Sequence, residues 1–191
     1  MIEVAKTLII KKTLLNIFLA FALFIFGPSC GGKSTLSHAL IEKLGPSWIY
    51  IDRDEMIEND LCSEEEADQA LDKKIQELSH QNLLIDSQLP WRAPYSPQEK
   101  TFLVYAPLEI LLKRDEKRCL KLNRSPKRAF FARQFVEKTF FEVFKIPENL
   151  GFSYDMVLDS SKMTLAEEIN QILAFLLLDP PMLRLTPPLS L

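Results

Sequence analysis

The feature that most constrains the fold of this chain is a glycine-rich octapeptide between an apolar run and an amphipathic segment. Residues 27–34 read GPSCGGKS, which fits the pattern G-x-x-x-x-G-K-[ST]. The preceding run, Phe18–Phe26, is apolar throughout, as expected for a strand buried on both faces. The following residues, Lys33–Leu44, carry leucine and isoleucine at helical spacing, and Gly45 follows them. The sequence therefore predicts a strand, a tight loop and a helix, a unit whose backbone N–H groups surround a phosphate.

Each residue type in this loop has a chemical reason to be there. Glycines let the chain turn tightly, so that successive N–H groups point at one phosphate. Lys33 is expected to reach the β- and γ-phosphates of ATP, and the Ser34 hydroxyl to hold Mg²⁺. The predicted nucleotide-binding residues are Gly27, Pro28, Ser29, Cys30, Gly31, Gly32, Lys33, Ser34 and Thr35.

The remainder of the chain alternates between strand and helix patterns. Further strands are expected at Trp48–Ile51, Leu83–Ile85, Phe102–Tyr105 and Met156–Leu158. Helices are expected from the capping box Ser63/Glu66 to about His80, from Pro107 to about Leu122, and from the capping pair Thr164/Glu167 to about Leu178, with a basic, partly helical stretch over 124–144. The prediction is an α/β fold, a three-layer α/β/α sandwich with a five-stranded, mostly parallel sheet.

The predicted domain organisation is one domain over residues 1–178. Within it, 1–17 form an N-terminal extension and 113–144 a lid region, and the proline-rich residues 179–191 form a loose tail. A 191-residue chain that is 47% apolar can bury a substantial core. Its three cysteines are far apart and odd in number, which argues against a disulfide scaffold or a zinc site and fits a reducing compartment.

Charge is unevenly distributed along the chain. The net charge of −3 argues against a general nucleic-acid binder, although a local basic patch remains open. Residues 51–79 carry eleven acids against three bases, and residues 113–138 carry ten bases against three acids. Such blocks are often solvated helix faces, and the basic block is also a candidate anion clamp.

The N-terminus allows two interpretations. The apolar run at 14–26, preceded by Lys6, Lys11 and Lys12, resembles a signal peptide. However, it is shorter than a membrane span, and no A-x-A cleavage pattern precedes Gly27. We therefore expect a buried first strand after an N-terminal extension and a cytoplasmic protein, with secretion or membrane association as the alternative.

Acidic side chains follow two predicted strands at the edge where a ligand would bind. Asp52 and Asp54 follow the second strand, where one could take the proton of an attacking hydroxyl and either could instead cap a helix. Asp86 follows the third strand, as in a Walker B segment, and is predicted to hold Mg²⁺ directly or through water. Asp52 is the candidate to join Asp86 and Ser34 in the metal site.

Two further groups are candidates for phosphoryl transfer and acceptor binding. Arg114 and Arg118 lie four residues apart on one helix face, and with Arg124 they could neutralise charge on the transferred phosphoryl group. Surface Arg–Glu pairing is the alternative for each. In the loop 88–98, three prolines stiffen the chain, and Trp91, Arg92 and Tyr95 are proposed to form the acceptor pocket; an ordinary loop pinned by its tryptophan is the alternative.

The order of these motifs resembles that of the small P-loop kinases, and most of all the chloramphenicol phosphotransferase-like and zeta-toxin-like kinases. The stretch DEMIE that begins at Asp54 is similar to the D-x-L-I-E stretch of the phosphotransferases, which implies that Asp54 is the catalytic base. The resemblance extends over residues 20–175 and assigns nucleotide and phosphoryl contacts to Lys33, Ser34, Arg114 and Arg118. The lid segment, longer and rich in phenylalanine, and the loop 88–98 depart from the family pattern.

The expected function is an ATP- and Mg²⁺-dependent kinase with a P-loop NTPase fold of the nucleoside-kinase type. Its acceptor would be a hydroxyl of a small molecule that is antibiotic-, nucleotide-sugar- or metabolite-like. One alternative is a P-loop ATPase or switch that acts through a protein interaction. Another is a polynucleotide 5′-hydroxyl kinase, which the basic stretch 113–138 allows. The aromatic residues in that stretch have helical spacing, however, and such residues more often lie in a core than stack on bases. The guanine-reading tetrapeptide N-K-x-D is absent from the sequence.

Overall fold

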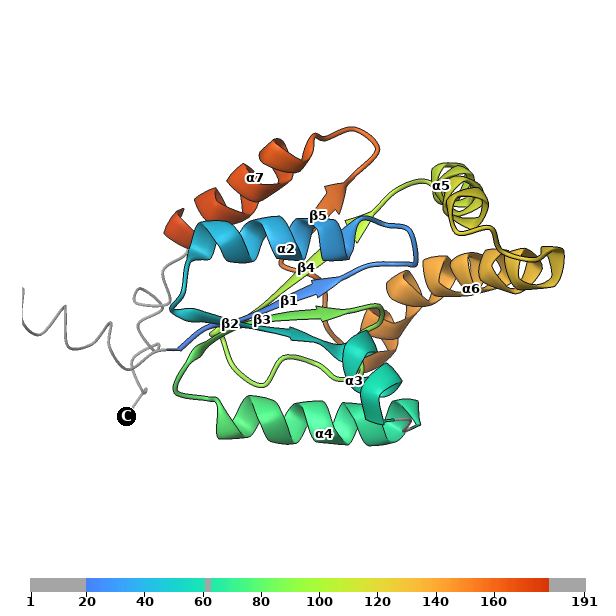
Figure 1. The fold of residues 1–191 in the computed structure, drawn as a ribbon. Helices are drawn as coiled ribbons and strands as arrows, with labels where there is room; N and C mark the ends of the chain where they lie inside the picture. Colours follow the sequence, from blue (N-terminus) through green and yellow to red (C-terminus); the bar gives the residue numbers. More distant parts are fainter. Residues whose placement is uncertain (1–19, 61–62, 179–191) are drawn as a thin grey trace, which may run out of the picture.

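The computed structural model describes residues 20–60 and 63–178, which form a five-stranded sheet with helices on both faces (Figure 1). The strands lie in the order β2-β3-β1-β4-β5, and all neighbours are parallel. Their bounds are β1 Ala22–Phe26, β2 Trp48–Asp52, β3 Asn82–Ser87, β4 Glu99–Tyr105 and β5 Met156–Asp159. The prediction of a three-layer α/β/α sandwich is confirmed, with a sheet that is parallel throughout.

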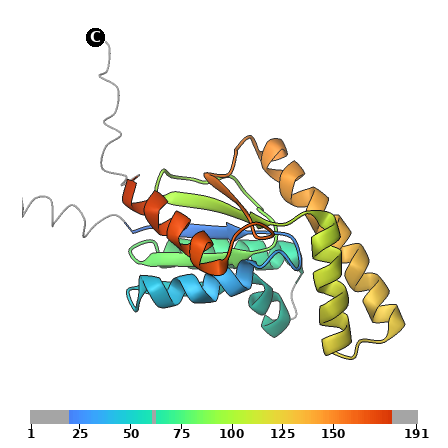
Figure 2. The ribbon, with the colours of Figure 1, turned by 90° about the horizontal axis from the view of Figure 1, so that it is seen from above.

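Helices cover both faces of the sheet and extend beyond one edge. Their bounds are α2 Lys33–Leu44, α3 Arg53–Asp60, α4 Glu64–Glu77, α5 Leu108–Lys121, α6 Pro126–Leu150 and α7 Leu165–Leu178. Helices α2 and α7 lie on one face, and α3 and α4 on the other (Figure 1). Helices α5 and α6 pack side by side and project from the carboxyl end of the strands (Figure 2). This is the edge at which α/β proteins bind ligands.

The apolar run before the glycine-rich loop becomes the central strand. All five residues of β1 are buried, because helices cover both faces of the sheet. Leu23 and Ile25 pack into the cluster that includes α2 and α7, whereas Phe24 and Phe26 pack into the cluster on the side of α4. Burial on two faces is the reason for an uninterrupted apolar run in place of an alternating one.

Both predicted helix caps are present. The Glu66 carboxylate accepts a hydrogen bond from Ser63 N at 2.8 Å, and the Ser63 hydroxyl accepts from Glu66 N at 3.3 Å. Thr164 and Glu167 pair in the same way, at 2.7 and 3.3 Å. These reciprocal bonds satisfy N–H groups that the first helical turn leaves unpaired, and they define the starts of α4 and α7.

Several predicted boundaries differ from the observed ones. The first strand begins at Ala22, and residues 18 and 19, the extension 1–17 and the tail 179–191 lie outside the described residues. Pro107 caps α5 and is not its first helical residue. The stretch expected to be partly helical over 124–144 is one continuous 25-residue helix, α6, which Gly151 ends in the left-handed conformation with φ 73°. Within the described ranges, no helix is long and apolar enough to cross a bilayer.

Candidate active site

The glycine-rich loop runs from the end of β1 to the start of α2, and two of its glycines have no room for a side chain. A Cβ atom on Gly27 would lie 2.3 Å from the Val104 carbonyl oxygen. One on Gly31 would lie 2.9 Å from the carbonyl oxygens of both Val104 and Pro28. Gly32, at the N-terminus of α2, has φ 104°, which side chains disfavour. The glycine spacing is therefore required by close approach of β4 and by backbone conformation.

Side chains of α5 and α6 form hydrogen bonds with the backbone of this loop. The Arg114 guanidinium of α5 donates to the carbonyl oxygens of Cys30 and Gly31, both at 3.3 Å, and to Ser160 Oγ and Ser160 O, both at 2.8 Å. Ser29 N donates to the Thr139 hydroxyl of α6 at 3.1 Å. Arg114 thus positions the loop through its carbonyl groups. Sequence reasoning assigned it to the transferred phosphoryl group, and in the structure its donors face the loop backbone.

Lys33 lies between two of the predicted carboxylates. Its Nζ atom is 3.4 Å from Asp86 Oδ1 and 3.6 Å from Asp54 Oδ2. The three residues come from α2, α3 and β3, which are far apart in sequence. The sheet brings them together because parallel strands end at the same edge.

Asp86 is fully buried, and its environment leaves one oxygen unsatisfied. Its Oδ1 atom has no hydrogen-bond partner among the described residues, although the Lys33 ammonium lies close by. Burial raises the pKa of the Asp86 carboxyl, an effect that the charge of Lys33 opposes and that of Asp52 reinforces. A buried carboxylate oxygen without a hydrogen-bond partner is the kind of metal ligand that a hard cation such as Mg²⁺ prefers.

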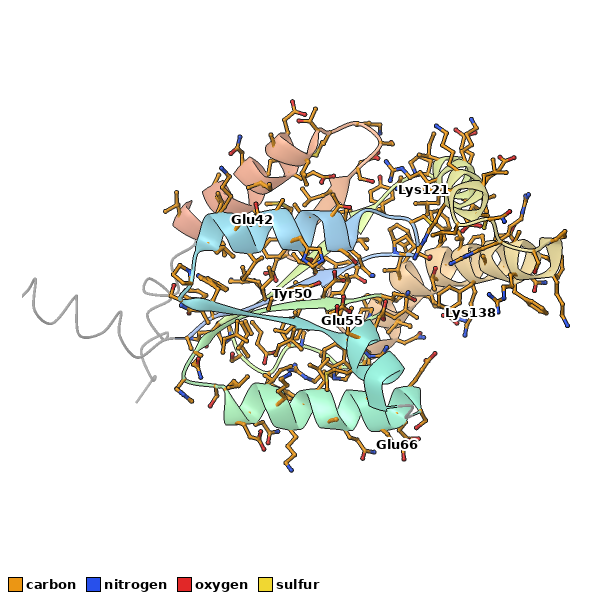
Figure 3. The ribbon with its side chains drawn as sticks, in the orientation of Figure 1. Glu42, Tyr50, Glu55, Glu66, Lys121 and Lys138 are labelled. Atoms are coloured by element: carbon orange, nitrogen blue, oxygen red, sulfur yellow. The ribbon has the colours of Figure 1, made fainter. Side chains whose placement is uncertain are left out.

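The tyrosine Tyr50 of β2 connects Asp86 with Asp52. Tyr50 lies between α2 and α3 in the view of Figure 3. Its hydroxyl lies 3.3 Å from Asp52 Oδ2 and 3.3 Å from Asp86 Oδ2, and its ring packs 5.0 Å from that of His38. Burial and the two carboxylates raise the pKa of Tyr50 well above its usual value, which keeps the hydroxyl protonated. Sequence reasoning missed this residue, because Tyr50 is an ordinary strand residue until β2 and β3 are placed in register.

Asp52 and Asp54 have different partners. Asp52 Oδ1 accepts from the backbone N–H groups of Asp54 at 2.8 Å and Glu55 at 3.4 Å, so Asp52 caps α3. Asp54 Oδ2 accepts from Gln88 Nε2 at 3.1 Å and faces Lys33. Asp54 is therefore the carboxylate that reaches the open site. Gln88, one residue after the end of β3, is a second residue that sequence reasoning missed.

A cavity of about 780 Å³ opens over the loop, between the sheet edge and the α5–α6 pair. Of the predicted residues, it is lined by 28–35, Asp54, Arg114 and Arg118. Arg124 lines the cavity as well. The other lining residues, which sequence analysis did not assign to the site, are Gln88, Asp115, Ala132, Phe135, Ser160, Met163, Leu165 and Glu168. Gly27, Asp52 and Asp86 lie behind this lining.

Glu168, in the first turn of α7, is a buried residue in the part of the cavity that α7 and the loop before it line. Its Oε1 atom has no hydrogen-bond partner in the described part of the chain, and burial raises the pKa of its carboxyl, against the opposing charge of Arg114. Met163 and Leu165 beside it provide apolar contacts. This part of the cavity therefore suits a planar group that carries hydrogen-bonding atoms.

The three side chains predicted to bind the acceptor do not line this cavity. Trp91 Nε1 donates to Asp72 of α4 at 3.2 Å, and its ring packs against Phe24 and Phe26. Arg92 binds Asp72 and Glu99, each at 2.7 Å, and Tyr95 stacks 3.9 Å from its guanidinium. The loop 88–98 thus joins α4 to the sheet, which agrees with the alternative of a loop pinned by its tryptophan.

The residues at the loop fit a magnesium ion together with a nucleotide. Asp86, at the carboxyl end of β3, and Ser34, in the first turn of α2, offer oxygen ligands. In the described ranges, no group of three or more histidine, cysteine, aspartate and glutamate side chains is arranged to hold a metal ion. One or two protein ligands are sufficient for Mg²⁺ in a nucleotide site, because phosphate oxygens and water molecules complete its coordination shell.

The comparisons with known proteins agree with this geometry at the level of the fold. No protein-family model and no curated protein sequence matches the chain. A shikimate kinase from Bacteroides thetaiotaomicron superposes with a TM-score of 0.58 at 14% identity, over 82% of this chain and 98% of that one. A shikimate kinase from Acinetobacter baumannii in complex with shikimate gives 0.56 at 17% identity, over 84% and 95%.

A third similar structure is the Pnkp1/Rnl/Hen1 RNA repair complex. It matches with a TM-score of 0.53 at 22% identity, over 72% of this chain and 47% of that one, so this chain spans about half of that protein. The fold is therefore that of the small P-loop kinases.

Proposed function

We propose that this protein is an ATP- and Mg²⁺-dependent phosphotransferase that transfers the γ-phosphate to a hydroxyl of a small molecule. The observation that carries the proposal is the position of Asp54. Its carboxylate lies 3.6 Å from the phosphate-binding lysine Lys33, at the mouth of the glycine-rich loop, where a hydroxyl would meet the γ-phosphate.

The nucleotide is bound by the loop and by the side chains around it. The N–H groups of the loop and of the first turn of α2 surround the phosphates, and Lys33 balances their charge. Mg²⁺, held by Ser34 and Asp86, would neutralise the developing charge on the phosphate oxygens. We assign the base of the nucleotide to the part of the cavity formed by Met163, Leu165 and Glu168.

Asp54 acts as the general base in this proposal. As the acceptor oxygen bonds to the γ-phosphorus, the bond from that phosphorus to the bridging oxygen breaks and ADP leaves with the electron pair. The hydroxyl proton passes to Asp54, whose carboxylate Gln88 holds in place. Arg118 and Arg124, which line the cavity and are bound to no carboxylate in the described structure, provide positive charge for the transferred group.

The class of acceptor has two candidates. The similarity of the DEMIE stretch to the chloramphenicol phosphotransferase-like kinases supports a small-molecule acceptor. The second candidate is a polynucleotide 5′-hydroxyl, which one observation favours: the phenylalanines of α6, expected in a core, are largely exposed. A role as a protein-binding switch remains the third alternative, because exposed phenylalanines are also typical of protein interfaces.

The test is ATP turnover measured with and without a panel of hydroxyl compounds, in the wild type and in Lys33→Ala. We expect acceptor-stimulated turnover, and at least a tenfold loss of ATP affinity or rate in the variant, about 1.4 kcal/mol or more. The control is Lys43→Ala, an exposed lysine at the far end of α2. A folded Lys33→Ala protein with native affinity and rate would contradict the assignment of the loop.

A further inference from the structure

The outer face of α6 is the most unusual surface of the described structure. Val136, Thr139 and Val143 form the buried face of this helix. On the opposite side Phe131 and Phe141 are 55% and 63% exposed, and Phe130, which is 58% exposed, lies nearer to α5 and lines a cavity with residues of that helix. The helix packs on α5 and otherwise projects from the sheet edge (Figure 2). Exposed phenylalanines gathered on one element indicate a binding surface.

Aromatic and basic residues alternate along this face. Positions three or four residues apart share one side of a helix. The outer stripe of α6, defined by this spacing, consists of exposed residues only: Lys127, Phe131, Gln134, Lys138, Phe141 and Lys145. Phe130 extends it, with its ring 5.8 Å from that of Phe131. Figure 3 shows side chains along α6, Lys138 among them, that extend outward from the helix.

The alternation favours one kind of ligand over two others. A helix that lies on a membrane separates its apolar face from its basic face, whereas here Lys138 stands between Phe131 and Phe141. A second copy of the chain that paired through the same stripe would bring lysines close to lysines. Single-stranded nucleic acid requires both residue types side by side, because bases stack on aromatic rings while phosphates contact cations.

The charge around the outer stripe supports the same ligand. Residues 108–150 contain eleven bases and six acids, although the molecule as a whole has a net charge of −3. Arg133 pairs with Glu137 at 3.3 Å, and Lys138 with Glu142 at 3.9 Å. Both are exposed ion pairs between residues four apart, which contribute little and exchange readily for a phosphate partner.

The outer stripe adjoins, at Phe131, the side of α6 that faces the candidate active site. Phe135, one turn after Phe131, lines the cavity over the glycine-rich loop together with Ala132. On the next turn Thr139 accepts the hydrogen bond from Ser29 N of that loop. A strand stacked along α6 can therefore pass Phe135 and present its terminal hydroxyl to Asp54.

We propose that the outer stripe of α6 binds single-stranded nucleic acid and directs its terminal 5′-hydroxyl into the cavity as the acceptor. The binding part is argued from the surface of α6 alone. The acceptor part rests on the proposed phosphotransferase function, with the second acceptor candidate, a polynucleotide 5′-hydroxyl, in place of a small molecule. It assigns to α6 a substrate-binding role, and to its exposed phenylalanines the role of a stacking platform.

The experiment measures fluorescence anisotropy of a single-stranded RNA of about 12 nucleotides, labelled at its 3′ end and carrying a free 5′-hydroxyl. We expect binding that weakens with salt. Phe131→Ala and Phe141→Ala should each weaken it by about fivefold or more, and Lys138→Gln should lower the slope of log affinity against log salt by about 0.7. Leu177→Ala and Lys43→Gln, exposed residues of α7 and α2, are the matched controls.

Catalysis is measured separately, as phosphate transfer from labelled ATP to the same RNA. Binding in wild type and in Lys33→Ala, with transfer in wild type alone, would support the proposal. No binding, or affinity unchanged in both phenylalanine variants, would overturn it. Binding without transfer, while a small molecule is phosphorylated, would overturn the acceptor part. Loss of all ATP turnover with RNA binding intact would instead contradict the proposed phosphotransferase function and leave the α6 surface supported.

Discussion

At the scale of single residues, Asp52 and Asp54 show how hydrogen-bond partners separate two carboxylates of similar sequence context. Both oxygens of Asp52 have partners, Oδ1 in capping α3 and Oδ2 at the Tyr50 hydroxyl. Asp54 uses only Oδ2, towards Gln88 and Lys33. A proton acceptor needs a free oxygen at the open site, and Asp54 has one.

We predict that Asp54→Asn lowers phosphate transfer by about 10²- to 10⁴-fold and leaves ATP affinity largely unchanged, because a general base acts on the acceptor and not on the nucleotide. The measurement is single-turnover transfer together with nucleotide titration. Asp52→Asn is the matched control, since asparagine caps a helix as well as aspartate does. Full transfer in Asp54→Asn, with loss in Asp52→Asn, would reverse the assignment.

Cys30 offers a chemical probe of the same site. It lies inside the glycine-rich loop with φ 64°, lines the cavity, and has its Sγ atom 3.9 Å from Asp115. We predict that Mg-ATP slows alkylation of Cys30, because phosphates bound in the loop restrict access to it. Peptide mapping by mass spectrometry measures the rate. Lys33→Ala should lose the protection, and equal rates with and without nucleotide in the wild type would contradict the prediction.

At the scale of elements, the loop between β3 and β4 stabilises the sheet in place of a helix. Arg92 is nearly buried, with 11% of its side chain exposed, and joins Asp72 of α4 to Glu99 of β4. Trp91 fills the space beneath β1. The residue types that suggested an acceptor pocket therefore serve packing and ion pairing.

Arg92→Ala should lower the free energy of unfolding by about 3–5 kcal/mol, because it leaves the carboxylates of Asp72 and Glu99 without their cation in a largely buried place. Urea denaturation measures this. Lys73→Ala, which breaks the exposed pair with Glu77, should change it by under about 0.5 kcal/mol. Loss of transfer without loss of stability in Arg92→Ala would instead support the original acceptor-pocket hypothesis.

At the scale of the whole molecule, charge is divided between two regions. The acidic block at 51–79 covers α3 and α4 under the sheet, and the basic block at 113–138 lies on α5 and α6 beyond its carboxyl edge. The cavity opens between the sheet edge and the basic pair of helices. An anionic substrate would therefore be attracted to the side of the molecule on which the glycine-rich loop lies.

The buried Asp86 should impose a pH dependence on global stability. Burial raises the pKa of Asp86 in the folded state above its value in the unfolded chain, about 4, so the folded state binds the proton more tightly. The contribution of Asp86 to the free energy of unfolding is therefore present in acid and is lost as the pH rises above about 4. We predict that Asp86→Asn has a Tm a few degrees above wild type at pH 7, with the difference vanishing in acid, and a higher Mg²⁺ requirement. Thermal unfolding from pH 4 to 8 measures this. Lower stability of the variant at pH 7 would show that the Lys33 contact outweighs desolvation.

The amino-acid sequence by itself determined the elements whose signals are local. The run before Gly27, the glycine spacing and the capping pairs at Ser63 and Thr164 specify a buried strand, a tight glycine-rich turn and two helix starts through contacts within a few residues. The mostly parallel sheet was predicted from these, because strands that alternate with helices favour parallel pairing.

Only the tertiary structure decided which side chains meet. Tyr50 joins Asp52 to Asp86 through the register of β2 and β3, Gln88 orients Asp54 across 34 positions, and Arg114 reaches the loop across 83. Periodicity likewise indicates that α6 has two faces but not which of them is covered. Burial depends on what packs against a face. In α6 the face towards α5 and the glycine-rich loop is covered, whereas the phenylalanines of the outer stripe are exposed.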